Sequence, residues 1–395
     1  MIMADVRRPH LPAMDALRAG AVLLVVALHA AVPYMAVQIP EVLWTLQDRS
    51  TNRLFEWVFL WCNGVSMPLF FLLAGLFAAM VCDERGAAAF LLQRTKRILL
   101  PFIAACILIL PITFYVWAGG WLLTGRCTMK EILRVQFDSS IQPNLYGPAH
   151  LWFLEYLFLL CLLFAAVTAL GTRRGKSVGV GAPVLFVGCT ALILWIDPGA
   201  PVHFHNSFVP NPGRFLYYTI FFFAGAWLLR DKRRLVGSTW LSALYVAVSL
   251  IAFCGVFWLL PSHLASGLEG GPRLLLVTAM VLFVWSSLFG FVGLAQHLVD
   301  REYPGVSYLA AASYWIYLVH FPVVGAAQIA LSQLPVAALV KFTVVFAVTM
   351  LVSLFSYERL VRHTCIGAWL NGTRRVKTTE ERSRRASAGA VAEAG

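Results

Sequence analysis

Charged residues are scarce in this chain of 395 residues. Asp, Glu, Lys and Arg make up 13% of it, whereas hydrophobic residues make up 60% and the mean hydropathy is +0.76. Soluble domains contain about 25% charged residues. The scarcity therefore excludes an ordinary soluble domain and indicates an integral membrane protein.

Paired cysteines are absent as well. The 8 cysteines are scattered singly, most of them in or beside apolar segments, and no CxxC motif occurs. Single cysteines in apolar surroundings behave as small buried hydrophobic side chains. The pattern therefore indicates neither a disulfide framework nor a zinc site, and we expect no bound metal and no bound cofactor.

Long polar stretches are rare, and apolar segments long enough to cross about 30 Å of hydrocarbon fill most of the chain. They lie at 15–37, 54–81, 98–118, 149–170, 181–197, 214–230, 238–260, 273–296, 306–331 and 335–357. The segments near 181 and 214 are short, which leaves a range of nine to eleven spans. The sequence therefore predicts an all-α, polytopic membrane helix bundle with about ten transmembrane helices.

The net charge of +12 would suggest a nucleic-acid partner in a soluble protein. Here most of the 31 Lys and Arg residues fall in alternate loops and at both ends of the chain. Basic residues concentrate on the cytoplasmic side of membrane proteins, so both termini are predicted to be cytoplasmic, with no nucleic acid bound. The divisions are a cytoplasmic N-terminus (1–13), a transmembrane domain (14–360) and a basic tail (361–395) that we expect to be disordered in the cytoplasm. The predicted location is the cell membrane.

Polar residues form a stripe within the first apolar segment. Arg18 and His29 are eleven residues apart, so on a helix they lie within about 20° of one face, and Asp15 lies within about 40° of it. An ionisable group in hydrocarbon costs on the order of 2.5 kcal/mol or more, so this face should meet protein or water and is a candidate site. Alternatively, Asp15 and Arg18 mark the helix end and His29 is a core histidine bonded to a carbonyl.

Basic residues gather where the third segment begins, at Arg94, Lys96 and Arg97. Guanidinium groups bind phosphate or carboxylate in a bidentate manner, although the residues alone favour the simpler explanation, the bias of basic residues towards the cytoplasm. Earlier in the chain, the small pair Ala74 and Gly75 predicts close packing of helices.

Two later segments carry further candidates. His150, Trp152 and Glu155 open the fourth segment, and Tyr317 and His320 lie in the ninth. His29 and His320 both lie about 21 Å from the inner ends of their helices. Their equal depth predicts a shared polar cavity. Two turn-rich outer loops, at about 119–148 and 198–213, are candidates for substrate contacts.

Five stretches, taken in order, resemble the acyltransferase 3 family of multi-spanning membrane acyltransferases. They are MDALRAGAVLLVVALHA, FFLLAGLF, RTKRILLP, HLWFLEYLF and SYWIYLVHFP. The resemblance runs from residue 13 to residue 360, and the HLWFL form is most similar to the glucans biosynthesis protein C branch. Its most specific elements are the pairs Arg18 and His29, Arg94 and Arg97, and Tyr317 and His320.

The resemblance implies transfer of a succinyl-type or acetyl-type group from cytoplasmic acyl-coenzyme A to a hydroxyl of an extracytoplasmic glycan or other carbohydrate. It also implies that His29 is the reacting base and that Arg94 and Arg97 act on the acyl donor. A histidine suits this task because its pKa lies near the working pH. The partners expected are therefore acyl-coenzyme A, a carbohydrate acceptor and the lipid bilayer.

The remaining candidates receive supporting roles. Asp15 or Arg18 would fix the entrance to the site, and Lys96 would join the donor-binding group. The side chains expected to orient the base or the acceptor are His150, Trp152, Glu155, Tyr317 and His320.

Two other classes of function remain open from the sequence. Ten helices with buried His, Arg and Glu also suit a proton-coupled transporter or flippase. Against that class, the sequence shows neither an internal repeat between its halves nor a pair of Gly- or Pro-broken helices at matching positions. The third class is a membrane partner without chemistry, against which the presence of both Arg18 and His29 weighs.

Overall fold

The computed structural model describes residues 12–37, 43–138, 141–170, 181–202, 206–230 and 238–371. Within these ranges the chain forms helices and no strands. The predicted N-terminus up to residue 11 and the predicted tail from residue 372 lie outside the described residues. The helices are α1 (Pro12–Ala31), α2 (Leu54–Arg85), α3 (Ala87–Arg94), α4 (Leu100–Leu123), α5 (Met129–Arg134), α6 (Trp152–Leu170), α7 (Ala182–Ile196), α8 (Pro212–Arg230), α9 (Thr239–Ser266), α10 (Gly270–Leu298), α11 (Pro304–Leu331), α12 (Ala338–Ser356) and α13 (Cys365–Asn371).

The all-α, polytopic membrane bundle is confirmed. Among the described residues, 8 helical stretches are long and apolar enough to cross a membrane. Each of the ten predicted segments coincides with a helix, and the two that the sequence marked as short are α7 and α8. With 15 residues, α7 is about 22 Å long, which is less than the usual hydrocarbon thickness. The orientation with cytoplasmic termini remains a prediction from the basic loops.

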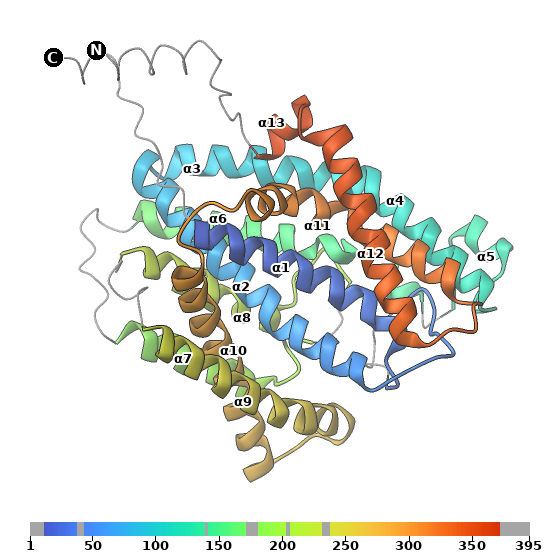
Figure 1. Cartoon of the computed structure of the whole chain (residues 1–395), viewed down its shortest axis with the longest axis horizontal. Helices are drawn as coiled ribbons and strands as arrows, with labels where there is room; N and C mark the ends of the chain where they lie inside the picture. Colours follow the sequence, from blue (N-terminus) through green and yellow to red (C-terminus); the bar gives the residue numbers. More distant parts are fainter. Residues whose placement is uncertain are drawn as a thin grey trace.

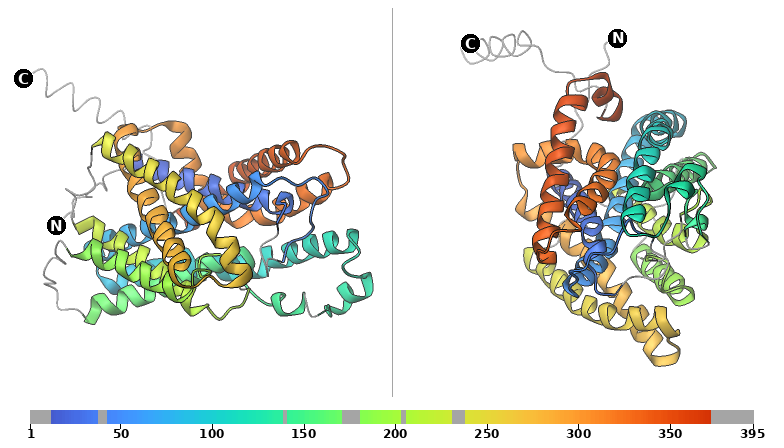
Figure 2. Two further views of the ribbon diagram at one scale, coloured as in Figure 1. Left: turned by 90° about the horizontal axis from the view of Figure 1, so that it is seen from below. Right: turned by 90° about the vertical axis from the view of Figure 1, so that its right-hand side faces the viewer.

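Helix α1 occupies the centre of the bundle and packs against α2, α10, α11 and α12 (Figure 1). Its small and β-branched side chains allow this close surrounding, and Ala21, Val22 and Val26 are fully buried. Two further views show the same helices crowded around α1, with α9 at the periphery (Figure 2). The helix that carries the polar stripe therefore faces protein.

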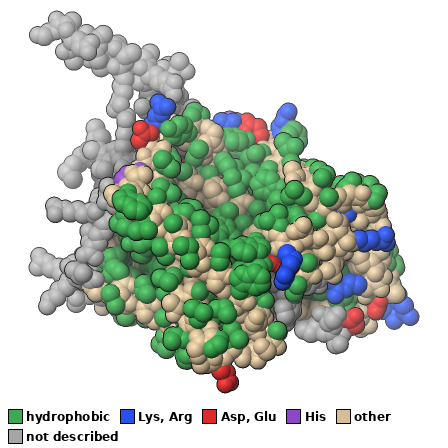
Figure 3. Space-filling view, turned by 60° about the horizontal axis from the view of Figure 1, so that its bottom comes forward, with side chains coloured by type: hydrophobic (Ala, Val, Ile, Leu, Met, Phe, Trp, Pro, Cys, Tyr) green, Lys and Arg blue, Asp and Glu red, His purple; other side chains and the backbone are tan. Residues whose placement is uncertain are grey.

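The outer helices show the opposite pattern. Ile107 and Leu108 on α4 and Ile251 on α9 are largely exposed, as are many other large apolar side chains on these helices. One face of the molecule is covered mainly by hydrophobic side chains, with few charges interrupting it (Figure 3). Such a surface suits contact with lipid tails.

Helices α2 and α8 approach each other through a pair of glycines. A Cβ atom at Gly75 would overlap the carbonyl oxygen of Phe222, and one at Gly225 would overlap that of Leu72. Only residues without a side chain permit this approach of two backbones. The packing role predicted for the small pair Ala74 and Gly75 is confirmed at Gly75.

Candidate active site

The polar stripe of α1 faces α11. The Arg18 guanidinium donates from Nη2 to the carbonyl oxygen of Ala310 at 2.5 Å and to Ser313 Oγ at 3.4 Å. Its Nη1 lies 3.6 Å from Asp15 Oδ1. Three turns further along, His29 meets α11 at His320. The predicted stripe is therefore a contact between two helices and is turned away from lipid.

The equal depth of His29 and His320 predicted a shared polar cavity; in the structure the two rings are in direct contact, and of the two only His29 lines the cavity described below. His320 is fully buried, and its Nε2 lies 3.1 Å from His29 Nδ1. His320 Nδ1 lies 3.1 Å from the carbonyl oxygen of Ile316 and 2.8 Å from that of Tyr317. Carbonyl oxygens only accept hydrogen bonds, so His320 Nδ1 carries the proton and its Nε2 accepts.

This arrangement also fixes the tautomer of His29. His29 Nδ1 faces two acceptors, the carbonyl oxygen of Val25 at 2.9 Å and Nε2 of His320. Nδ1 must therefore carry the proton, which leaves the lone pair on Nε2. That nitrogen has no hydrogen-bond partner among the described residues, and His29 lines a cavity. His29 thus combines a carbonyl-bonded nitrogen with a second nitrogen that can accept a proton.

A proline orients the third histidine. Pro322 has no N–H, so the carbonyl of Leu318, one turn earlier in α11, lacks its helical donor. His150 Nε2 fills this place at 3.0 Å. The Tyr317 hydroxyl donates to the backbone oxygen of His150 at 2.5 Å. Both contacts attach the start of the fourth predicted segment to α11, and the ring of His150 stacks on Phe321 at 4.6 Å between centroids.

Sequence reasoning missed two residues that support His29. The Trp44 indole stacks parallel to the His29 ring, with centroids 5.9 Å apart and an interplanar angle of 11°. Its Nε1 donates to Gln328 Oε1 at 2.8 Å, while Gln328 Nε2 donates to the carbonyl oxygen of His29 at 3.0 Å. Pro33 removes the helical donor for that carbonyl. A glutamine within an apolar helix was the signal that could have identified Gln328.

A buried ion pair holds the chain segment that carries Trp44. Lys341 Nζ lies 2.7 Å from Asp48 Oδ2, and both side chains are almost completely buried. Ser50 accepts a hydrogen bond from the backbone of Ala338 at 2.9 Å. These contacts tie the segment after α1 to the start of α12 and so keep the indole over His29.

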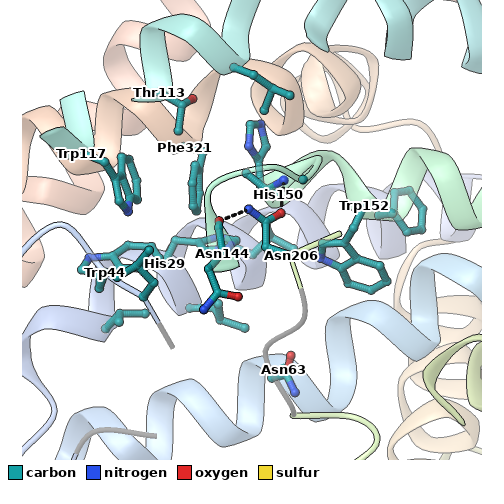
Figure 4. Close-up of a pocket in the computed structure, with 18 of the residues that line it drawn as sticks. His29, Trp44, Asn63, Thr113, Trp117, Asn144, His150, Trp152, Asn206 and Phe321 are labelled. Atoms are coloured by element: carbon teal, nitrogen blue, oxygen red, sulfur yellow. Dashed lines mark hydrogen bonds between the residues drawn. The ribbon is translucent and has the colours of Figure 1, made fainter. Parts of the chain in front are cut away.

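The cavity beside His29 has a volume of about 190 Å³. Its wall combines aromatic rings with amides, and no Asp or Glu is among the described residues that line it. His29, His150, Trp152 and Tyr317 line it, together with Asn144 and Asn206 from the two predicted outer loops. Asn206 bridges these loops, accepting from the backbone of Ala149 at 2.7 Å and donating to the carbonyl oxygen of Asn144 at 2.7 Å (Figure 4). The loop residues 203–205 lie outside the described residues.

The other predicted site residues do not line this cavity. Arg94 Nη2 donates to the carbonyl oxygen of Phe77 at 3.3 Å, and Lys96 is exposed. The backbone oxygen of Arg97 accepts from the Tyr314 hydroxyl at 3.1 Å. Asp15, Arg18 and Glu155 are also absent from the wall of the cavity. Arg18 lies eleven residues from His29, about 16 Å along α1, so the predicted cations lie apart from the cavity, which on the predicted orientation is at the outer side of the membrane.

The described residues contain no cluster of His, Cys, Asp and Glu that could hold a metal ion. The His320 ring instead contacts both other histidine rings, tilted against His29 with 5.0 Å between centroids and edge-on to His150 at 5.4 Å. Comparison with known proteins now adds a decisive observation: the sequence profile of an acyltransferase domain family, acyltransferase 3, matches residues 11–358. The chain belongs to the acyltransferase 3 family.

Membership makes the protein an enzyme that transfers acyl groups, and it favours this class over the transporter that the sequence left open. No match was found among the curated proteins or among the solved structures. The match covers every helix that contributes to the histidine group. The cavity at His29 is accordingly the candidate active site of this acyltransferase.

Proposed function

We propose that this acyltransferase moves an acyl group from cytoplasmic acyl-coenzyme A to a hydroxyl of an extracytoplasmic carbohydrate, with His29 as the base. One observation carries the proposal. His29 Nδ1 is held by two acceptors, so the lone pair of Nε2 is left beside the cavity. A neutral imidazole in this tautomer is ready to take a proton from a hydroxyl group.

The proposed reaction moves one proton and exchanges one bond. The acceptor oxygen attacks the thioester carbonyl while its proton passes to His29 Nε2. The new C–O ester bond forms, the C–S bond breaks, and the proton leaves with the thiolate of coenzyme A. His320 supports the imidazolium of His29, because its Nε2 accepts a hydrogen bond from the Nδ1–H of His29 throughout the step. Trp44 and Phe321 hold the ring in place by stacking and by edge contact.

The donor would bind from the opposite side of the membrane. Arg94, Lys96 and Arg97 are the proposed contacts for the phosphates of coenzyme A, because cations at this position suit phosphate oxygens. Tyr314, whose hydroxyl bonds the backbone of Arg97, lies six residues before His320, about 9 Å along α11. The pantetheine arm would have to cover this depth. Asp15 and Arg18 would border the path of the pantetheine arm. Glu155 would lie outside the acceptor cavity.

The acceptor would occupy the outer cavity. Aromatic rings and amides, as found at Trp152, Asn63 and Asn144, are the side chains expected in a site for sugar rings. We propose a glucan or related glycan as the acceptor, with a succinyl-type or acetyl-type acyl group. We also propose the cell membrane as the location and similarity to the glucans biosynthesis protein C branch as the closer relationship.

The test uses purified protein in proteoliposomes, with labelled acyl-coenzyme A on the side of the cytoplasmic face and a glucan on the side of the extracytoplasmic face. Mass spectrometry of the glucan should show covalent acylation by the wild type and none by His29→Ala. His263→Ala is the matched control, because this histidine bonds the backbone of Leu268 at the end of α9 and lies outside the cavity wall. Retained acylation by His29→Ala in folded protein would remove His29 from the mechanism.

A further inference from the structure

Among the described residues, Arg214 is the one Lys or Arg side chain that lines the outer cavity. Arg214 is the third residue of α8, and its guanidinium stacks on the Trp152 ring with 4.0 Å between Cζ and the ring centroid. Its Nε is buried without a hydrogen-bond partner. Among the described residues, no carboxylate pairs with Arg214 and none lines the cavity. The positive charge thus faces a cavity whose described wall contains no negative one.

The local structure does not explain a cation here. Asn211 caps α8 by accepting from the backbone of Arg214 at 2.9 Å, and Pro212 supplies the first helical residue. Arg214 therefore lies in the first turn, where the helix dipole disfavours positive charge. Arg214 is partly buried and has no anion beside it among the described residues, which is unfavourable for a cation. By contrast, the fully buried Lys341 is neutralised by Asp48.

The neighbours of Arg214 suit a sugar with a negative substituent. Trp152 offers an aromatic ring beside the guanidinium, and the side-chain amide of Asn144 has no partner among the described residues. The Tyr218 phenol also lies beside the guanidinium. A planar guanidinium binds carboxylate and phosphate through paired hydrogen bonds.

We propose that Arg214, stacked on Trp152, is a subsite for an oxyanion carried by the acceptor, so that this acyltransferase modifies an acidic carbohydrate. This rests on the proposed function and specifies its substrate class. Trp152 lies on the far side of Asn144 and Asn206 from His29 and Trp44 (Figure 4). The oxyanion binds away from the hydroxyl that reacts. Loss of the Arg214 guanidinium should therefore weaken acceptor binding more than it slows the chemical step.

The experiment compares wild type, Arg214→Gln and Arg214→Lys with a labelled acetyl donor and three oligosaccharides: neutral, uronate-bearing and phosphoglycerol-bearing. For an anionic acceptor, Arg214→Gln should raise the KM about tenfold or more, as expected for a charge-assisted hydrogen bond. The KM for the neutral acceptor should stay unchanged. Arg214→Lys should give a KM for the anionic acceptor between those of the wild type and Arg214→Gln. Whether the uronate-bearing or the phosphoglycerol-bearing acceptor depends on Arg214 identifies the oxyanion as carboxylate or phosphate.

The matched control is Arg273→Gln. Arg273 also stacks on a tryptophan, Trp195, and bonds the carbonyl oxygens of Trp195 and Ile196, but it does not line the cavity. It should change no KM value. Equal loss for neutral and anionic acceptors in Arg214→Gln, or no loss for either, would overturn the proposal. A loss confined to a succinyl donor on a neutral acceptor would also overturn it, because the oxyanion would then belong to the acyl group.

A binding measurement separates this proposal from the proposed function. Calorimetric titration of the three oligosaccharides into wild type and Arg214→Gln requires no turnover. Preferential binding of an anionic oligosaccharide that disappears in Arg214→Gln supports the subsite even if no acceptor is acylated. Equal affinity for all three in the wild type contradicts the subsite even if acylation occurs.

Discussion

His320 should act on the reaction only through His29, and its replacement gives a quantitative test. His320 is fully buried and presents Nε2 to His29 Nδ1 at 3.1 Å. His320→Phe keeps a ring of similar shape but removes this acceptor. His29 retains its bond to Val25, so the chemical step loses only the amount by which the bond to His320 strengthens when His29 becomes charged, about 0.5–1.5 kcal/mol from the difference between charged and neutral hydrogen bonds. At 1.36 kcal/mol per factor of ten, the expected fall in kcat is about two- to twelvefold.

The comparison with His29 gives this number its meaning. General base catalysis contributes about 10²- to 10⁴-fold, so His29→Ala should lose far more than His320→Phe. His320→Gln supplies a side-chain oxygen that can accept the Nδ1 proton, and it should recover most of the loss. The KM values for donor and acceptor should stay near those of the wild type, because His320 does not line the cavity.

Single-turnover measurement of labelled acyl transfer, at saturating donor and acceptor, checks this expectation. Thermal unfolding of each variant in detergent shows whether the buried site tolerates the substitution. If His320→Gln and His320→Phe both lose as much activity as His29→Ala while remaining folded, His320 itself handles the proton. The assignment of Nε2 of His29 as the free base would then be refuted.

Three further substitutions test other parts of the structure. Asp48→Asn leaves Lys341 buried without its partner and should lower the free energy of unfolding by about 3–5 kcal/mol. Glu358→Gln, in an exposed ion pair, should lower it by less than about 1 kcal/mol. Equal losses in thermal unfolding would contradict the difference in burial. Gln328→Leu should destabilise by about 1–3 kcal/mol and lower kcat, and an unchanged enzyme would deny its support of the first helix. Arg97→Ala should raise the KM for acyl-coenzyme A more than the KM for the acceptor, because Arg97 is proposed to contact the phosphates of the donor. Equal effects on both KM values would leave Arg97 a role in topology alone.

The sequence predicted those parts of the site that depend on helix geometry alone. The spacing of Arg18 and His29 predicted that both lie on one face, and both contact α11; the equal depth of His29 and His320 predicted that they lie near each other, and the structure brings them into contact, although only His29 lines the cavity. Rise and rotation per residue suffice for such predictions. The roles of these residues in the reaction remain proposals.

The parts that sequence reasoning missed depend on long-range contacts. Trp44 lies in an irregular segment, and its place over His29 follows from an ion pair between residues 293 positions apart, Asp48 and Lys341. No local pattern encodes that return of the chain. For the same reason the sequence could place Arg97 at one end of a helix but could not predict that it lies outside the cavity wall.

Prolines explain how an apolar bundle acquires a polar centre without exposed backbone. A membrane helix satisfies its own carbonyl groups, so a side chain from another element normally finds no free acceptor on it. Pro322 releases the carbonyl of Leu318, which His150 then uses, and Pro33 releases the carbonyl of His29, which Gln328 uses. Each missing N–H thus leaves one carbonyl oxygen free to accept. One is used by His150, which lines the cavity, and the other by Gln328, which holds the backbone of His29. The chain orients its histidines with its own backbone, which leaves the cavity itself free of carboxylates among the described residues and able to receive a substrate.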